Sequence, residues 1–214
     1  MIMAATGSPT SLSWVLFLVA VAAGFSIGYL NGGRAGRLRI PASLLLGALA
    51  AFAIQIGLTW LPKKTFGADA RLVLLIATYC IVLVPLLYVA ATSLRSRLGA
   101  LGTAALLFVL AGWALNTAPI AFNGGMPVSR SALNAAGYAV DQNPANFDRS
   151  WKHVLATRKT HLARLSDTVA VRPLHAVYSI GDFLLLAGIS TLIAAGMRGE
   201  FATSGESPSF SPVY

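Results

Sequence analysis

The sequence is poor in cysteine and in charge. Its 214 residues include one cysteine, and charged residues make up 11% of the chain against 56% hydrophobic residues. The single Cys80 excludes an internal disulfide, and its place inside an apolar run is typical of a small buried side chain. So few charges exclude an ordinary soluble domain, because a chain of this length cannot bury so much apolar surface in water. We therefore expect a membrane protein.

Acidic residues are especially scarce. Seven Asp and Glu stand against sixteen Lys and Arg, which gives a formal net charge of +9. In a soluble protein this excess would favour a nucleic-acid partner. Here the basic residues lie almost entirely between apolar runs, as they do in loops at a membrane surface. Membrane lipids are thus expected as partners, and nucleic acid is not.

The sequence is rich in long apolar runs. Five segments are long enough to cross a hydrocarbon core of about 30 Å, which takes roughly 20 helical residues. In lipid the backbone must satisfy its own hydrogen bonds, so these runs predict helices and an all-α bundle. Residues 1–201 are expected to form one transmembrane domain and the Ser-, Pro- and Gly-rich residues 202–214 a disordered tail. The expected spans are residues 12–30, 40–61, 72–93, 98–122 and 177–197.

Arginines on the short loops predict the orientation. Residues 1–13 contain no Lys or Arg, which favours a retained anchor over a cleaved signal peptide. The positive-inside rule then places the N-terminus outside and the C-terminus in the cytoplasm. The short loop 62–71 opposes this orientation with Lys63, Lys64 and Arg71. The arginines on the expected cytoplasmic side are Arg34, Arg37, Arg39, Arg95, Arg97 and Arg198.

The long segment 123–176 is the expected extracytoplasmic loop. It opens with Asn123, Gly124 and Gly125, which predict a turn and also resemble an anion-binding nest of backbone amides. From Phe147 to about Leu165, apolar residues recur at spacings of three, four and seven. This pattern predicts a basic amphipathic helix at the membrane interface. Its candidate contacts to anionic lipid are Lys152, Arg158, Lys159 and Arg164.

Asp182 is the only carboxylate in or at the edge of an expected span. Ionisable groups at membrane depth are functional candidates, because burying them is unfavourable. Ser179 and Asp182 also have the spacing of a capping box before an apolar run, and an ion pair with Arg172 is a third explanation. Asn116, near the outer end of the fourth span, could line a cavity beside the kink at Pro119, although an interhelical hydrogen bond explains it as well.

The three histidines, His153, His161 and His175, do not have the spacing of a metal site. His153 and His161 lie eight residues apart, whereas a helical zinc pair needs four. None of the three falls inside an expected span, which disfavours an intramembrane haem. We expect no catalytic residue, metal or cofactor.

Two motifs give the chain a family resemblance. Asn123-Gly124-Gly125 runs into Met-Pro-Val, and Ser179 opens the sequence Ser-Ile-Gly-Asp at the last span. With these motifs, residues 14–197 resemble a group of small bacterial polytopic membrane proteins of unknown function. The stretch Thr160–Asp167 is similar to the family's T-x-L-x-x-L-x-D segment. The resemblance implies a bacterial plasma membrane and a shared architecture, and no activity.

Both motifs are expected on the same side of the membrane. We therefore hypothesise one polar cluster beneath the amphipathic helix, formed by Asn123, Gly124, Gly125, Asp167, Ser179 and Asp182. The leading functional hypothesis is a non-catalytic accessory or scaffold subunit, or a small sensory module, with other membrane protein subunits as partners. The alternative is a small transporter or lipid-handling protein that binds anionic lipid or phosphate at the basic loop. An enzyme would need Asp182 to converge with His161 or His175.

Overall fold

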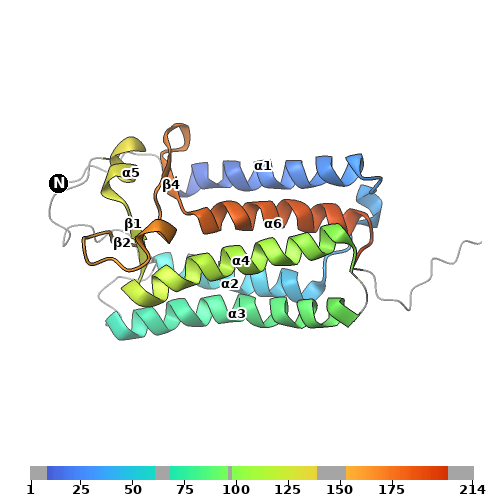
Figure 1. The fold of residues 1–214 in the computed structure, drawn as a ribbon, viewed down its shortest axis with the longest axis horizontal. Helices are drawn as coiled ribbons and strands as arrows, with labels where there is room; N and C mark the ends of the chain where they lie inside the picture. The colour runs from blue at the N-terminus through green and yellow to red at the C-terminus, as the bar shows by residue number, and fades with distance from the viewer. Residues whose placement is uncertain (1–8, 61–67, 96–97, 139–152, 202–214) are drawn as a thin grey trace, which may run out of the picture.

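Five long helices run side by side along the length of the molecule (Figure 1). The computed structural model describes residues 9–60, 68–95, 98–138 and 153–201. Each of the five expected spans falls on a helix, because an apolar run in lipid must close its hydrogen bonds within itself. The helices are α1 (Pro9–Leu30), α2 (Ala42–Trp60), α3 (Ala68–Arg95), α4 (Ala100–Asn123) and α6 (Ile180–Met197).

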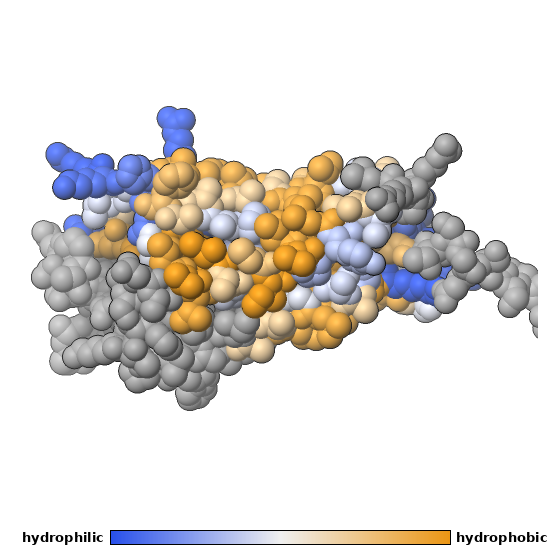
Figure 2. Space-filling view, turned by 90° about the horizontal axis from the view of Figure 1, so that it is seen from below, coloured by the Kyte–Doolittle hydropathy of each residue, from blue (hydrophilic) through white to orange (hydrophobic). Residues whose placement is uncertain are grey.

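Three stretches within these helices are long and apolar enough to cross a membrane: Leu72–Thr92, Ala100–Asn123 and Ile180–Met197. Val15–Leu30 of α1 is apolar but shorter within the described part of the chain. Figure 2 shows apolar residues in a broad band along the helices, with hydrophilic residues gathered toward the two ends. Among the residues that the structure describes, three helices therefore have membrane-crossing length and composition, where the sequence predicted five spans.

Helix α6 is the centre of the packing. It lies between α1 and α4, while α3 packs against α4 on one side and α2 on the other. Glycines permit the close approaches: a Cβ added at Gly112 would lie 2.7 Å from the Gly181 carbonyl oxygen, and one at Gly24 would lie 2.7 Å from the Ser190 carbonyl oxygen. Small residues at contacts of this kind are typical of helix packing in membranes.

The polar end of the molecule is built from the described residues between α4 and α6 (124–138 and 153–179), which we call the cap. Strands β1 (Met126–Val128) and β2 (His153–Leu155) pair in parallel, and β3 (Val169–Val171) pairs antiparallel with β4 (Ala176–Tyr178). The short helices are α5 (Arg130–Ala135), η4 (Ala163–Leu165) and η5 (Arg172–Leu174). Val128, Leu133 and Leu155 form the apolar core of the cap.

The prediction of a helical fold is confirmed in its main part, since the described residues are mostly helical with four strands of three residues each. The amphipathic helix predicted from Phe147 to Leu165 is wrong where the structure describes it. Residues 147–152 lie outside the described residues, and 153–155 form strand β2. Its backbone pairs with β1, and Ala156 donates its N–H to the Val128 carbonyl at 2.9 Å. Leu162 then adopts a left-handed φ of 54°, which ends any helical continuation. The spacing of apolar residues predicted a helix because local spacing carries no information about pairing with a strand far away in the sequence.

The end opposite the cap joins α1, α4 and α6. The loop after α1, which includes η1 (Ala35–Arg37), donates the Arg34 N–H to Met197 O and the Arg39 N–H to Gly196 O, both at 3.1 Å. These bonds satisfy carbonyls that the last turn of α6 would leave unpaired. Glu200 accepts the Gly102 N–H at 2.7 Å and so stabilises the first turn of α4.

Candidate functional site

Three polar side chains form a closed ring of hydrogen bonds between α4 and the start of α6. Asn116 donates Nδ2–H to Asp182 Oδ1 at 2.8 Å, and its Oδ1 accepts from the Ser179 hydroxyl at 2.7 Å. The Ser179 hydroxyl in turn accepts the Asp182 N–H at 3.0 Å, while Asp182 Oδ2 accepts the Ser179 N–H at 2.9 Å. We call these residues the Asn116–Ser179–Asp182 ring.

The ring depends on the capping box and on glycine. Ser179 and Asp182 form the predicted capping box, which is confirmed, and it places both side chains at the first turn of α6. Gly112 and Gly181 bring the two helix backbones together, so that the short Asn116 side chain reaches the capping box. Asn116 and Ser179 are buried. Asn116 thus makes an interhelical hydrogen bond, which was one of the two explanations proposed for it from the sequence. The other explanation, a cavity lined by Asn116, is not needed.

The structure divides the hypothesised polar cluster into three separate contacts. Only Ser179 and Asp182 belong to the ring. Asn123, at the end of α4, binds the backbone of His161 through both atoms of its amide, each bond at 2.9 Å. Asp167 lies in the cap, where its carboxylate is 3.3 Å from Nε2 of His153.

Gly124 and Gly125 end helix α4. Gly124 has a left-handed φ of 69° and donates its N–H to Ile120 O, and Gly125 donates to the same oxygen at 3.2 Å. This is the geometry of a glycine helix terminus. The two amides are therefore used by the helix end, and the turn explains the glycines better than an anion-binding nest.

The basic residues chosen as lipid contacts lie on an exposed loop of the cap. Arg158, Lys159 and Arg164 are exposed, and Lys152 lies outside the described residues. Asn123 ties this loop to the end of α4 through His161, whose ring lies 6.3 Å from that of Phe122. Cationic and apolar side chains thus share one part of the cap surface.

Tyr138 connects the two described parts of the cap. Its hydroxyl donates to the His175 carbonyl, and His175 Nδ1 lies 3.1 Å from Ala136 O. Burial raises the pKa of Tyr138, and the neighbouring Tyr178 phenol raises it further. The folded protein therefore favours the neutral form of Tyr138.

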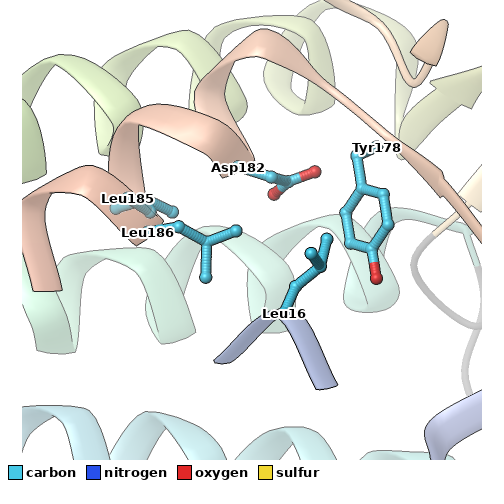
Figure 3. A pocket seen from close by; sticks show the side chains of 5 residues that line it. All are labelled: Leu16, Tyr178, Asp182, Leu185 and Leu186. Carbon is cyan, nitrogen blue, oxygen red and sulfur yellow. The ribbon is translucent and has the colours of Figure 1, made fainter. Parts of the chain in front are cut away.

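A pocket of about 220 Å³ lies beside the ring. Its walls come from α1, from β4 and from the first two turns of α6 (Figure 3). The lining residues are Leu16, Tyr178, Asp182, Leu185 and Leu186. The Tyr178 hydroxyl is buried and has no hydrogen-bond partner in the described part of the chain. This pocket could not be predicted from the sequence, because Leu16 on α1 lies far along the chain from the other four lining residues.

Metal-ligating side chains do not gather in the part of the chain that the structure describes. No group of three His, Cys, Asp or Glu residues there could hold an ion. The histidines lie apart, with His153 at Asp167, His161 at the end of α4 and His175 beside Ala136.

Comparison with known proteins identifies a family. No curated protein and no solved structure gives a significant match. The model of DUF5317, a family of unknown function, matches residues 39–194, which span α2 to α6 and include the ring and the cap. Because this match covers most of the sequence, the chain belongs to the DUF5317 family.

Proposed function

We propose that this chain is a non-catalytic protein of the bacterial plasma membrane that crosses the bilayer five times and acts as an accessory or scaffold subunit, or as a small sensory module. The observation that carries the proposal is the closed Asn116–Ser179–Asp182 ring. Each side chain in it is bonded to another member, including both oxygens of Asp182. A carboxylate that makes these hydrogen bonds stabilises the fold. The bonds therefore support a structural role for Asp182, which was the strongest catalytic candidate in the sequence.

The distribution of charge supports an orientation with the cap outside. Arg34, Arg37 and Arg39 lie on the loop that binds the last turn of α6, and Arg198 lies at the same end, with its guanidinium 3.2 Å from Asn31 O. Short arginine-rich loops favour the cytoplasm. The cap, at the other end of α4 and α6, then faces outward, and the N-terminus lies on the cap side.

The cap is the surface proposed for partner subunits. It has its own apolar core and is joined to the bundle by the ring and by Asn123. A rigid polar end on an apolar bundle presents fixed side chains to a neighbour outside the bilayer. Val169 on β3 is one apolar side chain exposed there.

The proposal is tested by purifying the tagged protein from its native membrane in mild detergent and identifying co-purified proteins by mass spectrometry. We expect a partner at a fixed stoichiometry, and we expect Val169→Ser to lower its recovery several-fold. Val73→Ser, at an exposed valine on α3, is the matched control and should retain the partner. A folded protein that purifies without any stoichiometric partner contradicts the subunit form.

The exposed basic loop favours a second candidate function, binding of anionic lipid or phosphate. Phe122 is 66% exposed and Leu162 42% exposed, next to the cationic Arg158, Lys159 and Arg164. Apolar and cationic side chains together suit the headgroup region of an anionic membrane. Replacing the three cations by Gln should lower binding to phosphatidylglycerol nanodiscs at low salt and leave binding to phosphatidylcholine nanodiscs unchanged. Equal binding by the variant and the original protein would rule this function out.

A further inference from the structure

The pocket beside the ring has an apolar wall and a polar end. Leu16, Leu185 and Leu186 supply the wall, and Tyr178 and Asp182 lie together at the other end (Figure 3). All five side chains are partly exposed, so the pocket is accessible from outside the protein. With a volume of about 220 Å³ it is an open groove and differs from the small enclosed voids of a packed interior.

The Tyr178 hydroxyl gives the pocket its chemistry. Its oxygen is buried, yet no group among the residues that the structure describes forms a hydrogen bond with it. A buried hydroxyl without a partner destabilises a fold by about 1–3 kcal/mol, so each such group calls for an explanation. The carboxylate of Asp182 does not supply a partner, because its bonds run to Asn116 and Ser179. The hydroxyl therefore lacks a partner within the described residues, and an acceptor in the pocket can supply one once the Tyr178 ring turns to expose the oxygen.

The position of the pocket limits what that acceptor can be. Tyr178 lies two residues before Ile180, the first residue of a helix long and apolar enough to cross a membrane. Tyrosine at such a boundary lies near the headgroup level, with hydrocarbon on one side. In glycerophospholipids the ester carbonyls lie at this depth, between the phosphates and the acyl chains. An ester carbonyl is a hydrogen-bond acceptor, and the chain attached to it matches the leucine wall.

We propose that the pocket binds one acyl chain of a membrane glycerophospholipid, with the ester carbonyl accepting a hydrogen bond from the Tyr178 hydroxyl. This inference uses the membrane location of the proposed function and needs neither its partner subunit nor the basic loop. Recognition through the ester and the chain makes binding insensitive to the charge of the headgroup. It therefore differs from the anionic-lipid function, which depends on Arg158, Lys159 and Arg164.

The test compares two synthetic lipids in native mass spectrometry of the detergent-purified full-length protein. One is a diester phosphatidylcholine, and the other is a diether phosphatidylcholine with the same headgroup and chain length but without the carbonyls. We expect one retained lipid per protein and about fivefold tighter binding of the diester, which is the effect of one ordinary hydrogen bond. Tyr178→Phe should abolish the preference for the diester. Leu186→Trp, which fills the pocket, should abolish retention of both lipids.

Two matched controls lie outside the pocket on α3. Tyr88→Phe and Leu87→Trp change exposed residues of the same kinds and should leave the preference for the diester intact. Tyr178→Phe should also unfold at a temperature no lower than that of the original protein in lipid-free detergent, because it removes a buried hydroxyl that makes no hydrogen bond within the described residues. Equal binding of diester and diether, or a preference that survives Tyr178→Phe, overturns the proposal. Either result is independent of whether a partner subunit is found.

Discussion

The amide of Asn116 on α4 is hydrogen-bonded to the carboxylate of Asp182 on α6 across 2.8 Å. Asp182 also belongs to the capping box that begins α6. The same carboxylate thus joins the start of one helix to the side of another. Helix capping and interhelical packing should therefore be lost together when Asp182 is changed, whereas a change at Asn116 removes the interhelical bonds alone.

Asp182→Ala should destabilise the protein by about 1–3 kcal/mol, because it leaves the Asn116 amide and the Ser179 N–H without an acceptor. Asn116→Ala should have an effect of similar size. The double variant should be less destabilised than the sum of the two single variants, since they remove one shared interaction. Denaturant unfolding in detergent, followed by circular dichroism, measures all three. Strictly additive effects would contradict the ring as a single unit.

Gly112→Ala should destabilise the α4–α6 contact by about 1–3 kcal/mol. The new Cβ would lie 2.7 Å from the Gly181 carbonyl oxygen and 2.8 Å from the Leu185 nitrogen, so the backbones must move apart. Gly36→Ala is the matched control, because a Cβ there meets nothing within 4 Å. The unfolding temperatures in detergent compare the two. Equal temperatures for both variants would show that the helices are not packed this closely.

Asn123→Ala should release the basic loop without unfolding the bundle. The Asn123 amide makes two hydrogen bonds to the backbone of His161, and no other side chain among the described residues is shown to bind these two backbone groups. Hydrogen exchange should therefore quicken at residues 157–165 and stay unchanged in α4 and α6. Asn134→Ala, at an exposed residue of α5, serves as the control. Unchanged exchange in the loop would mean that something other than Asn123 holds it.

Tyr138 should titrate above the ordinary tyrosine pKa of about 10. Burial and, second, the neighbouring Tyr178 favour its neutral form. Its contribution to stability is therefore present below the ordinary pKa and is lost as the pH rises through the raised value. The difference in phenolate absorbance between the original protein and Tyr138→Phe gives the midpoint, and Tyr178→Phe should lower that midpoint. A Tyr138 midpoint at or below 10 would contradict this environment.

The long helices could be predicted from sequence, because each apolar run must be helical in lipid whatever it packs against. The capping box was equally predictable, since Ser179 and Asp182 are only three residues apart. The cap was not predictable in the same way. Its β1–β2 pairing joins Met126 to His153 across 27 positions of sequence, and no local periodicity encodes such a contact.

The hypothesised polar cluster was predicted only in part. It grouped Asn123 and Asp167 with Ser179 and Asp182 because all four lie on one side of the expected membrane. The partner in the structure is Asn116, about two turns before Asn123 on α4, and the choice depends on the close approach of Gly112 to Gly181. Such an approach is set by packing between helices. Glycines in a sequence indicate that two helices can approach closely, but they do not indicate which glycines lie at the contact.

The proposed orientation, with the cap outside the cell and the α1–α2 loop inside it, is tested most directly by cysteine accessibility in intact cells. Cys80 is the only cysteine, so Cys80→Ser gives a cysteine-free background. Thr168→Cys in the cap and Gly36→Cys in the loop, both at exposed positions, are then labelled with a membrane-impermeant maleimide. We expect Thr168→Cys to be labelled in intact cells and Gly36→Cys only after permeabilisation. Labelling of both in intact cells, or the reverse pattern, would contradict the five-span topology with an outward cap.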